Sequence, residues 1–119
     1  MNYDLNINDR PFNAIKAGTK KIEGRTRKSD NDIDYDLVAS GDILTFANKT
    51  TNEKMVCEVL FVTKYGDVRS MLEVEGVENV LSSGLDIEGG IESYNSLEGY
   101  EEGIKKYGIW AIGVKCINS

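Results

Sequence analysis

Residues 17–28 read AGTKKIEGRTRK and are the most basic part of the chain, with the apolar residue Ile22 at their centre. Residues 16–28 hold six of the fourteen basic residues and one acid, Glu23, which gives this segment a net charge of +5. The whole chain carries −6, so the remaining residues together carry −11. A strand-forming core residue inside a basic segment argues against a disordered basic tail.

A glycine turn at Gly18 is followed by a predicted strand over residues 20–26. In an extended chain, Lys21, Glu23 and Arg25 point to one face, and Ile22 points to the other, toward the core. We therefore expect this segment to line a cleft for an anionic or base-like ligand. The alternative is a solvated strand face whose charges pair with one another, which contributes little stability.

The length of 119 residues indicates one domain over residues 1–119, long enough to bury roughly two-thirds of its unfolded surface. Its 40% hydrophobic and 29% charged residues are typical of a globular protein. The net negative charge argues against broad, nonspecific attraction to nucleic acid or to an anionic membrane. A local basic site on an acidic body favours small or structured anionic ligands.

The chain has two cysteines, Cys57 and Cys116, and no histidine. Both cysteines lie in apolar runs and are predicted to be buried thiols in strands, although their spacing does not exclude a disulfide. Without histidine or a C-x-x-C motif, the common zinc sites and the Ser-His and Cys-His nucleophile pairs are excluded.

Four alternating acids at residues 30, 32, 34 and 36 resemble the start of a calcium loop. An EF-hand loop starting at Asp30 needs glycine at its sixth position and glutamate at its twelfth, where this chain has Tyr35 and Gly41. We therefore expect a solvated acidic loop, no metal and no cofactor. The N-terminus lacks an apolar signal core and no apolar run approaches the ~20 residues of a membrane span, which predicts a cytoplasmic protein.

The hydrophobic pattern predicts strands and helices in a mixed order. The predicted strands are 2–8, 20–26, a hairpin of 43–48 with 54–65, and 109–117; the predicted helices are 10–17, one capped by Asp67, one near 77–81, and 91–106, with a loop at 84–90. The 54–65 strand is apolar on both faces, so it is expected to be central. This order predicts an α+β fold: a small β-barrel of about five to six mostly antiparallel strands with short peripheral helices.

This order and several motifs resemble the ASCH domain of the PUA-like superfamily. The most specific match is the pattern G-x-K-x-x-E-x-R at Gly18, Lys20, Glu23 and Arg25, placed after a short helix and at the start of a strand. The smaller matches run across almost the whole chain: Pro11-Phe12, Ile15-Lys16, Gly41-Asp42 with Ile43 and Phe46, Tyr65, Met71-Leu72, Glu75-Gly76, Tyr107-Gly108 and Ala111-Ile112.

The resemblance implies a PUA-like β-barrel whose cleft, beside the first helix, is lined by the G-x-K-x-x-E-x-R segment. The family is linked to RNA and nucleotide binding, which implies RNA, a nucleotide or a modified nucleoside as the partner. Lys20, Lys21 and Arg25 are suited to a phosphate or a base carbonyl, and Glu23 to an exocyclic amine. Stacking on bases is expected from an aromatic residue. The candidates are Phe12 and Tyr65, with Tyr35, Tyr94 and Trp110 as alternatives.

A bacterial branch of the family resembles amidohydrolases that remove the acetyl group of N4-acetylcytidine with a Lys, a Thr and a Glu. The lysine falls on Lys20, the threonine position holds Glu23, and the glutamate matches Glu78, or less closely Glu75 or Glu73. The expected catalytic residues of this alternative are Lys20, Glu23 and Glu78. Two further alternatives are a ribonuclease, as in another branch, and a protein-interaction module using the acidic helical region 67–106.

Overall fold

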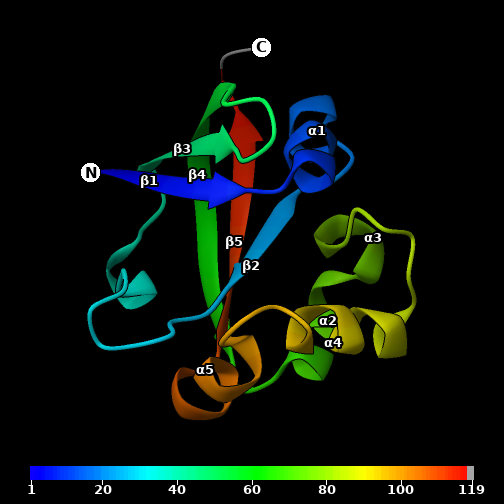
Figure 1. Cartoon of the computed structure of the whole chain (residues 1–119). Coiled ribbons are helices and arrows are strands. Elements are labelled where there is room, and N and C mark those ends of the chain that lie inside the picture. The colour runs from blue at the N-terminus through cyan, green and yellow to red at the C-terminus, as the bar shows by residue number, and fades with distance from the viewer. Residues whose placement is uncertain (118–119) are drawn as a thin grey trace.

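The computed structural model describes residues 1–117 (Figure 1). The strands are β1 (Asn2–Ile7), β2 (Ile22–Arg25), β3 (Ile43–Asn48), β4 (Lys54–Tyr65) and β5 (Ile109–Cys116). The helices are α1 (Asp9–Ala17), α2 (Val68–Glu75), α3 (Val77–Val80), α4 (Ile87–Asn95) and α5 (Tyr100–Tyr107), with a short 3₁₀ helix, η1 (Tyr35–Leu37). No helix among these residues is long and apolar enough to cross a membrane.

The five strands form one mixed sheet in the order β1-β3-β4-β5-β2, curled into a half-barrel. The predicted hairpin of β3 and β4 is confirmed, and β4 is the central strand, as its two apolar faces indicated. Strand β1 pairs in parallel with β3, and the other three pairings are antiparallel. The α+β barrel with mostly antiparallel strands and short peripheral helices is therefore confirmed. Strands β1 and β2 are the two edges of the sheet.

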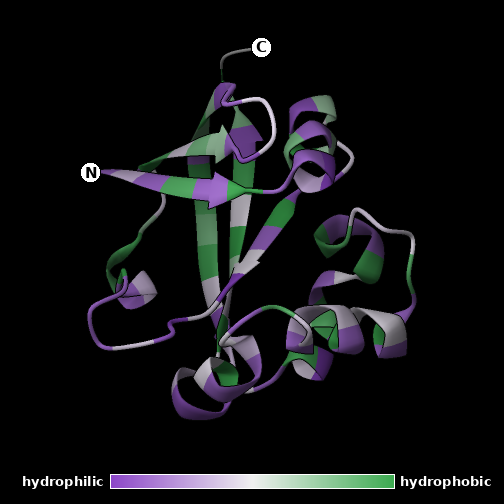
Figure 2. Cartoon of the chain, in the orientation of Figure 1, coloured by the Kyte–Doolittle hydropathy of each residue, from purple (hydrophilic) through white to green (hydrophobic). Residues whose placement is uncertain are grey.

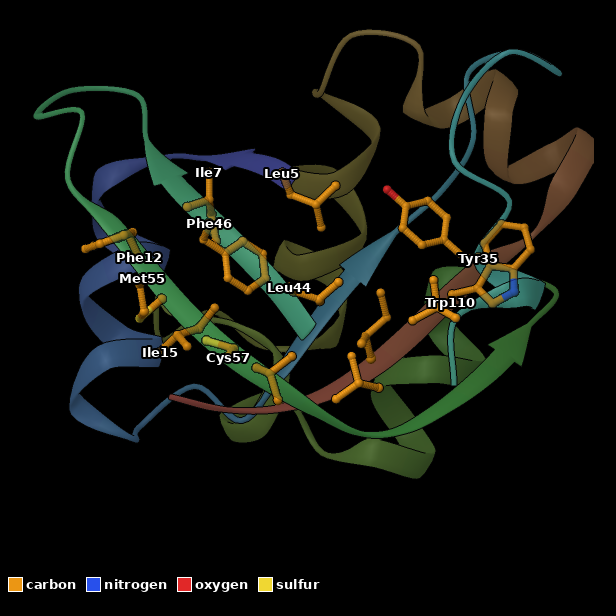
Figure 3. Close-up of a cluster of buried hydrophobic side chains, with 14 residues drawn as sticks. Leu5, Ile7, Phe12, Ile15, Tyr35, Leu44, Phe46, Met55, Cys57 and Trp110 are labelled. Carbon is orange, nitrogen blue, oxygen red and sulfur yellow. The ribbon is translucent and has the colours of Figure 1, made fainter. Parts of the chain in front are cut away.

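Two apolar clusters pack on the sheet. The first contains residues of all the strands except β2, together with Phe12 and Ile15 of α1, and Figure 3 shows Phe12 beside Met55 and Ile15. The second joins Ile22 and residues of β5 to helices α2 to α5. Along β1, hydrophilic and hydrophobic residues alternate, as the purple and green bands in Figure 2 show, and the hydrophobic Leu5 and Ile7 are the buried ones. Burying a large side chain such as Phe12 contributes about 1.5–3 kcal/mol of hydrophobic free energy.

The segment 84–106 differs from its prediction. The predicted loop at 84–90 already contains the start of α4, which Asp86 caps by accepting from the Gly89 N–H at 2.8 Å. The predicted single helix 91–106 is two helices: α4 ends at Asn95, and Gly99, with a φ of 77°, is the N-cap residue from which α5 begins. Figure 1 shows α4 and α5 as separate helices near one end of the sheet, with α1 near the other end.

Candidate functional site: a cleft between the two edge strands

A cleft of about 730 Å³ lies between the edge strands β1 and β2, and is called the β1–β2 cleft below. Residues 4–8 and 23–26 supply its two strand walls, and helices α3 to α5, the 28–35 loop, the start of α1, Lys20 and Lys49 supply the rest. Its lining residues are Asp4, Leu5, Asn6, Ile7, Asn8, Arg10, Pro11, Lys20, Glu23, Gly24, Arg25, Thr26, Lys28, Asp32, Ile33, Tyr35, Lys49, Val80, Leu81, Ser82, Ser83, Ser93, Tyr94, Leu97, Glu98 and Tyr100.

Main-chain groups of both edge strands face this cleft. The Val114 N–H donates to the Lys21 carbonyl, so in the alternating antiparallel ladder Glu23 and Arg25 bond to β5 while the main chain of Gly24 faces the open edge. On the other edge, the N–H of Lys49, the residue after β3, donates to the carbonyl of Ile7. Main-chain groups of successive strand residues point to opposite sides, so the main chain of Asn6 faces away from β3 and into the cleft. Side chains of the cleft already engage these edge groups: the Asn6 carbonyl accepts from Arg25, and the Gly24 main chain forms a hydrogen bond with the Tyr94 hydroxyl.

Three charged side chains form a buried cluster on the β2 wall. Lys20 and Glu23 are only 5% and 7% exposed, and the Lys20 Nζ lies 3.4 Å from Glu23 Oε1. The Arg25 Nε donates to Glu23 Oε2 at 2.7 Å, and its Nη2 donates to the Asn6 carbonyl across the cleft at 2.7 Å. Glu23 therefore bridges two cations, and a buried carboxylate needs such partners to remain charged.

Burial and charge act in opposite directions on the pKa values of this cluster. Burial alone would raise the pKa of Glu23, but the Arg25 and Lys20 charges outweigh it and lower that pKa below its usual range. Burial lowers the pKa of Lys20, and Glu23 opposes this shift only in part. Burial alone would lower the pKa of Arg25, but the Glu23 charge outweighs burial and raises that pKa above its usual value. Glu23 is therefore an ionised hydrogen-bond acceptor at neutral pH.

Lys20 also holds one wall of the cleft in place. Its Nζ donates to the carbonyl oxygen of Ile22 at 2.6 Å and to the carbonyl oxygen of Val80, the last residue of α3. With Glu23 nearby, all three N–H groups of the ammonium have acceptors. The residues that follow Val80 line the cleft, so Lys20 positions that wall.

Tyr35, Tyr94 and Tyr100 line the cleft and bring three aromatic rings to it. The rings of Tyr94 and Tyr100 are stacked, with centroids 6.2 Å apart and an interplanar angle of 20°. Burial raises the pKa of all three hydroxyls, that of Tyr100 to about 12. These hydroxyls are neutral at physiological pH, and each combines a polar group with an aromatic surface.

The cleft brings together three of the predicted site residues, Lys20, Glu23 and Arg25. Tyr35 and Tyr94, two of the alternative stacking residues, line it as well. The remaining predicted side chains do not line it; they are Phe12, Lys21, Tyr65, Glu78 and Trp110. Phe12 is fully buried in the core beside Met55, as Figure 3 shows. Lys21 lines a separate groove.

The last two predicted residues lie on the helical side of the molecule. The Tyr65 hydroxyl donates to the Glu75 carboxylate, and Tyr65 packs against the second apolar cluster. Glu78 is exposed on α3 and lines neither the cleft nor the groove near Lys21. Glu78 therefore shares no pocket with the Lys20–Glu23 pair on which the amidohydrolase alternative depends.

Several cleft residues were not assigned to a site from the sequence. The sequence predicts a strand over residues 2–8 but no site on it, although Asn6 is part of the cleft. Likewise, Tyr100 carries no site signal in the sequence, and neither do Arg10 and Lys49. Their charges matter, because five basic residues (Arg10, Lys20, Arg25, Lys28, Lys49) and four acids (Asp4, Glu23, Asp32, Glu98) line the cleft. The cleft is nearly balanced in charge and is not the strongly positive site that residues 16–28 suggested.

Among residues 1–117, no group of three or more His, Cys, Asp or Glu side chains is arranged to hold a metal ion. The alternating acids of the 30–36 segment instead make local contacts. The Lys28 N–H donates to Asp32, and the Trp110 Nε1 donates to Asp36 at 2.9 Å.

Three solved structures are similar to this chain. The crystal structure of hypothetical protein PH0355 has a TM-score of 0.82 and 34% identity, covering 98% of this chain and 100% of that one. The solution NMR structure of protein PF0455 from Pyrococcus furiosus has a TM-score of 0.75 and 32% identity, covering 100% of both chains. The crystal structure of the ASCH domain from Lactobacillus crispatus JV V101 has a TM-score of 0.58 at 13% identity, covering 97% of this chain and 79% of that one, and shows the fold alone.

A comparison with curated proteins found no match. The family model of the ASCH domain matches residues 5–118, which include the end of β1, all of β2 and every residue of the charged cluster. The chain therefore belongs to the ASCH domain family.

Proposed function

We propose that the β1–β2 cleft binds the base of a nucleotide, a modified nucleoside or an unpaired RNA residue. The observation that carries this proposal is the Glu23–Arg25 pair, whose acceptor and donor groups lie side by side in a cleft lined by tyrosines. Glu23 is suited to an exocyclic amine of a base. Arg25 is suited to a ring nitrogen or a carbonyl.

The size and charge of the cleft support a single base over a polymer backbone. About 730 Å³ lies within the range of small-molecule sites, roughly 300–1,000 Å³. A phosphate backbone favours a strongly positive surface, whereas five basic and four acidic residues line this cleft. The tyrosines offer surfaces for stacking, which is how proteins commonly hold unpaired bases. The link of the ASCH family to RNA agrees with this assignment.

The proposal is tested by NMR titration with cytidine, adenosine, uridine, guanosine, N4-acetylcytidine and their 5′-monophosphates. We expect saturable shifts at residues 4–8, 23–26 and 94–100, and stronger binding of bases that carry an amine. Glu23→Gln should weaken the preference for amine-bearing bases, because an amide oxygen is a weaker acceptor than a carboxylate. Lys21→Gln, at the residue before β2, is the matched control. Shifts confined to residues 67–80, or no saturation with any nucleoside, would contradict the proposal. Shifts on the acidic helices with a protein partner would favour the protein-interaction alternative.

The amidohydrolase alternative is supported by one observation, the 3.4 Å contact between Lys20 Nζ and Glu23 Oε1 at the cleft wall. A lysine nucleophile needs a free lone pair, but the Lys20 ammonium donates to two carbonyl oxygens and contacts Glu23. Glu23, with its lowered pKa, is ionised and is a poor proton donor at neutral pH. This arrangement favours binding over hydrolysis. Release of acetate from N4-acetylcytidine by the wild type, but not by the Glu23→Gln variant, would instead favour hydrolysis over binding alone.

A further inference from the structure

The two cysteines lie directly opposite each other on neighbouring strands. Cys57 of β4 is the register partner of Cys116, the last residue of β5, and the structure holds both as thiols. The Ile117 N–H donates to the Val56 carbonyl at 2.9 Å. Hydrogen-bonded and non-hydrogen-bonded pairs alternate along an antiparallel ladder, so this bond at the next pair makes Cys57 and Cys116 a non-hydrogen-bonded pair.

This class of pair has the geometry that a disulfide requires. Its Cα atoms are typically about 4.5 Å apart and its side chains project from the same face of the sheet. Disulfides join residues whose Cα atoms are roughly 4.4–6.8 Å apart. The two thiols already interact, because Cys116 contributes through a side-chain hydrogen bond to the raised pKa of Cys57. The register and the type of this pair are therefore those in which a cross-strand disulfide can form.

The two thiols differ in their access to solvent. Cys57 is fully buried, lies opposite Leu44 of β3, and is close to Ile15 in Figure 3. Burial, with a smaller effect of Cys116, raises the pKa of the Cys57 thiol to about 12. Cys116 is half-buried and lines a groove of about 340 Å³ between the end of α1 and strands β4 and β5. A reagent from solution therefore reaches Cys116 first.

The groove around Cys116 is rich in positive charge. Lys16, Lys20, Lys21 and Lys115 line it together with the exposed Leu60, and no acid is among its lining residues. Two of these lysines have acidic partners outside the groove, Lys16 with Glu53 and Lys20 with Glu23. The Lys16 ammonium is close enough to Cys116 to interact with it electrostatically. Reactive cysteines are found in partly exposed, electropositive surroundings of this kind. Such a groove attracts an anionic reagent and leaves space for it beside the sulfur.

We propose that Cys116 is the reactive thiol and Cys57 the resolving thiol of a cross-strand pair that an anionic small-molecule disulfide, such as oxidised glutathione, converts to a disulfide. In the first step the Cys116 thiolate attacks one sulfur of the reagent, and the reagent's S–S bond breaks to release one thiolate. In the second step the Cys57 thiolate attacks the Cys116 sulfur and releases the second. The two protons of the protein thiols end on the two reagent thiols, so the protein is oxidised and the reagent is reduced.

This pair is independent of the proposed base-binding function, because neither cysteine lines the β1–β2 cleft. Lys20 is the one side chain of the charged cluster that lines both the cleft and the groove. The experiment on the cysteines therefore succeeds or fails without reference to any nucleoside.

The test is to incubate the reduced protein with oxidised glutathione, block the remaining thiols with N-ethylmaleimide, and measure intact and peptide masses. The wild type should lose the mass of two hydrogen atoms, take up no maleimide, and yield a peptide that joins residues 57 and 116. It should also show a higher Tm, which falls back on reduction, since the bond closes a long loop. A wild type that stays reduced, stops at a glutathione adduct, or forms dimers overturns the proposal.

Two variants check the order of the steps. Cys57→Ser should stop at a glutathione adduct on Cys116, and Cys116→Ser should remain unmodified, because Cys57 is buried. If Cys57→Ser does not fold, Cys57→Ala provides the same test with an apolar side chain. Removing the groove charges in Lys21→Gln/Lys115→Gln should slow the reaction with oxidised glutathione several-fold and slow that with neutral hydroxyethyl disulfide less, because only the anionic reagent is attracted by the lysines. If the variant slows the reactions with both reagents by the same factor, or slows neither, the role of the lysines in attracting an anionic reagent is contradicted.

Discussion

Arg25 of β2 donates a hydrogen bond from Nη2 to the main-chain carbonyl of Asn6 in β1, and this 2.7 Å contact joins the two edge strands of the sheet. The two strands form no ladder with each other, so the half-barrel stays open between them. The same guanidinium holds Glu23 through Nε. One side chain therefore links the wall of the cleft, its charged cluster and the opposite strand.

Replacing Arg25 by lysine should show that the planar guanidinium, and not only its charge, is required. An ammonium is a single point donor and cannot reach both Glu23 and the Asn6 carbonyl in the present geometry. We expect Arg25→Lys to lower the free energy of unfolding by about 2–3 kcal/mol, measured by urea denaturation at neutral pH. The control is Lys21→Gln at an exposed position of the same segment, which should change the free energy of unfolding little. An Arg25→Lys protein of unchanged stability would contradict the requirement for a planar guanidinium.

Glu23 should make the stability of the protein depend on acidic pH. Its pKa in the folded state is lowered from the ordinary value of 4.5, so the folded state binds its proton less readily than the unfolded state does. The stabilisation is therefore fully present above about pH 4.5 and is lost as the pH falls toward the lower, folded-state pKa. We expect the urea midpoint of Glu23→Gln to fall less steeply below pH 4.5 than that of the wild type. Identical slopes would mean that Glu23 titrates normally.

Much of the fold was predictable because the local signals agree with the tertiary structure. The two apolar faces of residues 54–65 require burial on both sides, which only a central strand provides. The alternation Lys20-x-x-Glu23-x-Arg25 placed Glu23 and Arg25 on one face of a strand, and the structure joins them in an ion pair. These features depend on neighbours in sequence, which a pattern can detect.

The rest of the cleft depends on contacts between distant segments. A continuous helix would separate Tyr94 and Tyr100 by about 9 Å along its axis and turn them to different sides. The break before α5 instead stacks their rings at 6.2 Å. From the sequence alone, the rings of Phe12 and Tyr65 are equally suitable for base stacking. In the structure, Phe12 is buried in the first apolar cluster and the Tyr65 hydroxyl is hydrogen-bonded to Glu75. Chemical suitability alone cannot decide which ring faces a cleft.

Gly24 should be intolerant of any side chain, because the Tyr94 hydroxyl occupies the place of its Cβ. A Cβ built on Gly24 would lie 2.4 Å from Tyr94 Oη and 3.0 Å from its Cζ. We expect Gly24→Ala to lower the free energy of unfolding by roughly 1–3 kcal/mol and to displace Tyr94 from the cleft.

Two further variants test this explanation of the Gly24 effect. Tyr94→Phe removes the hydroxyl, so the double variant Gly24→Ala/Tyr94→Phe should recover part of the stability lost in Gly24→Ala. Gly66→Ala is the control, since a Cβ at Gly66 meets no atom within 4 Å. Additive effects of the Gly24 and Tyr94 substitutions in urea denaturation would show that the two residues do not compete for space.

Lys20 should prove to be a positioning residue for the wall of the cleft that follows α3. Lys20→Met keeps most of the apolar volume but leaves the buried carbonyl oxygens of Ile22 and Val80 without their donor and Glu23 with one cation fewer. We expect a loss of about 3 kcal/mol in the free energy of unfolding. Amide hydrogen exchange should quicken more at residues 80–83 than at the centre of β4, because the tie between β2 and α3 is lost.

The matched control for Lys20 is Lys16→Met, because Lys16 is a lysine of the same segment whose ion pair with Glu53 is exposed to solvent. Exposed pairs contribute little to stability, so Lys16→Met should leave both the urea midpoint and the exchange at residues 80–83 close to those of the wild type. A purely catalytic Lys20 predicts the opposite pattern: Lys20→Met would then keep its stability and its exchange rates and lose only turnover. Unchanged exchange at residues 80–83 in a folded Lys20→Met protein would thus refute the positioning role and return Lys20 to the amidohydrolase alternative.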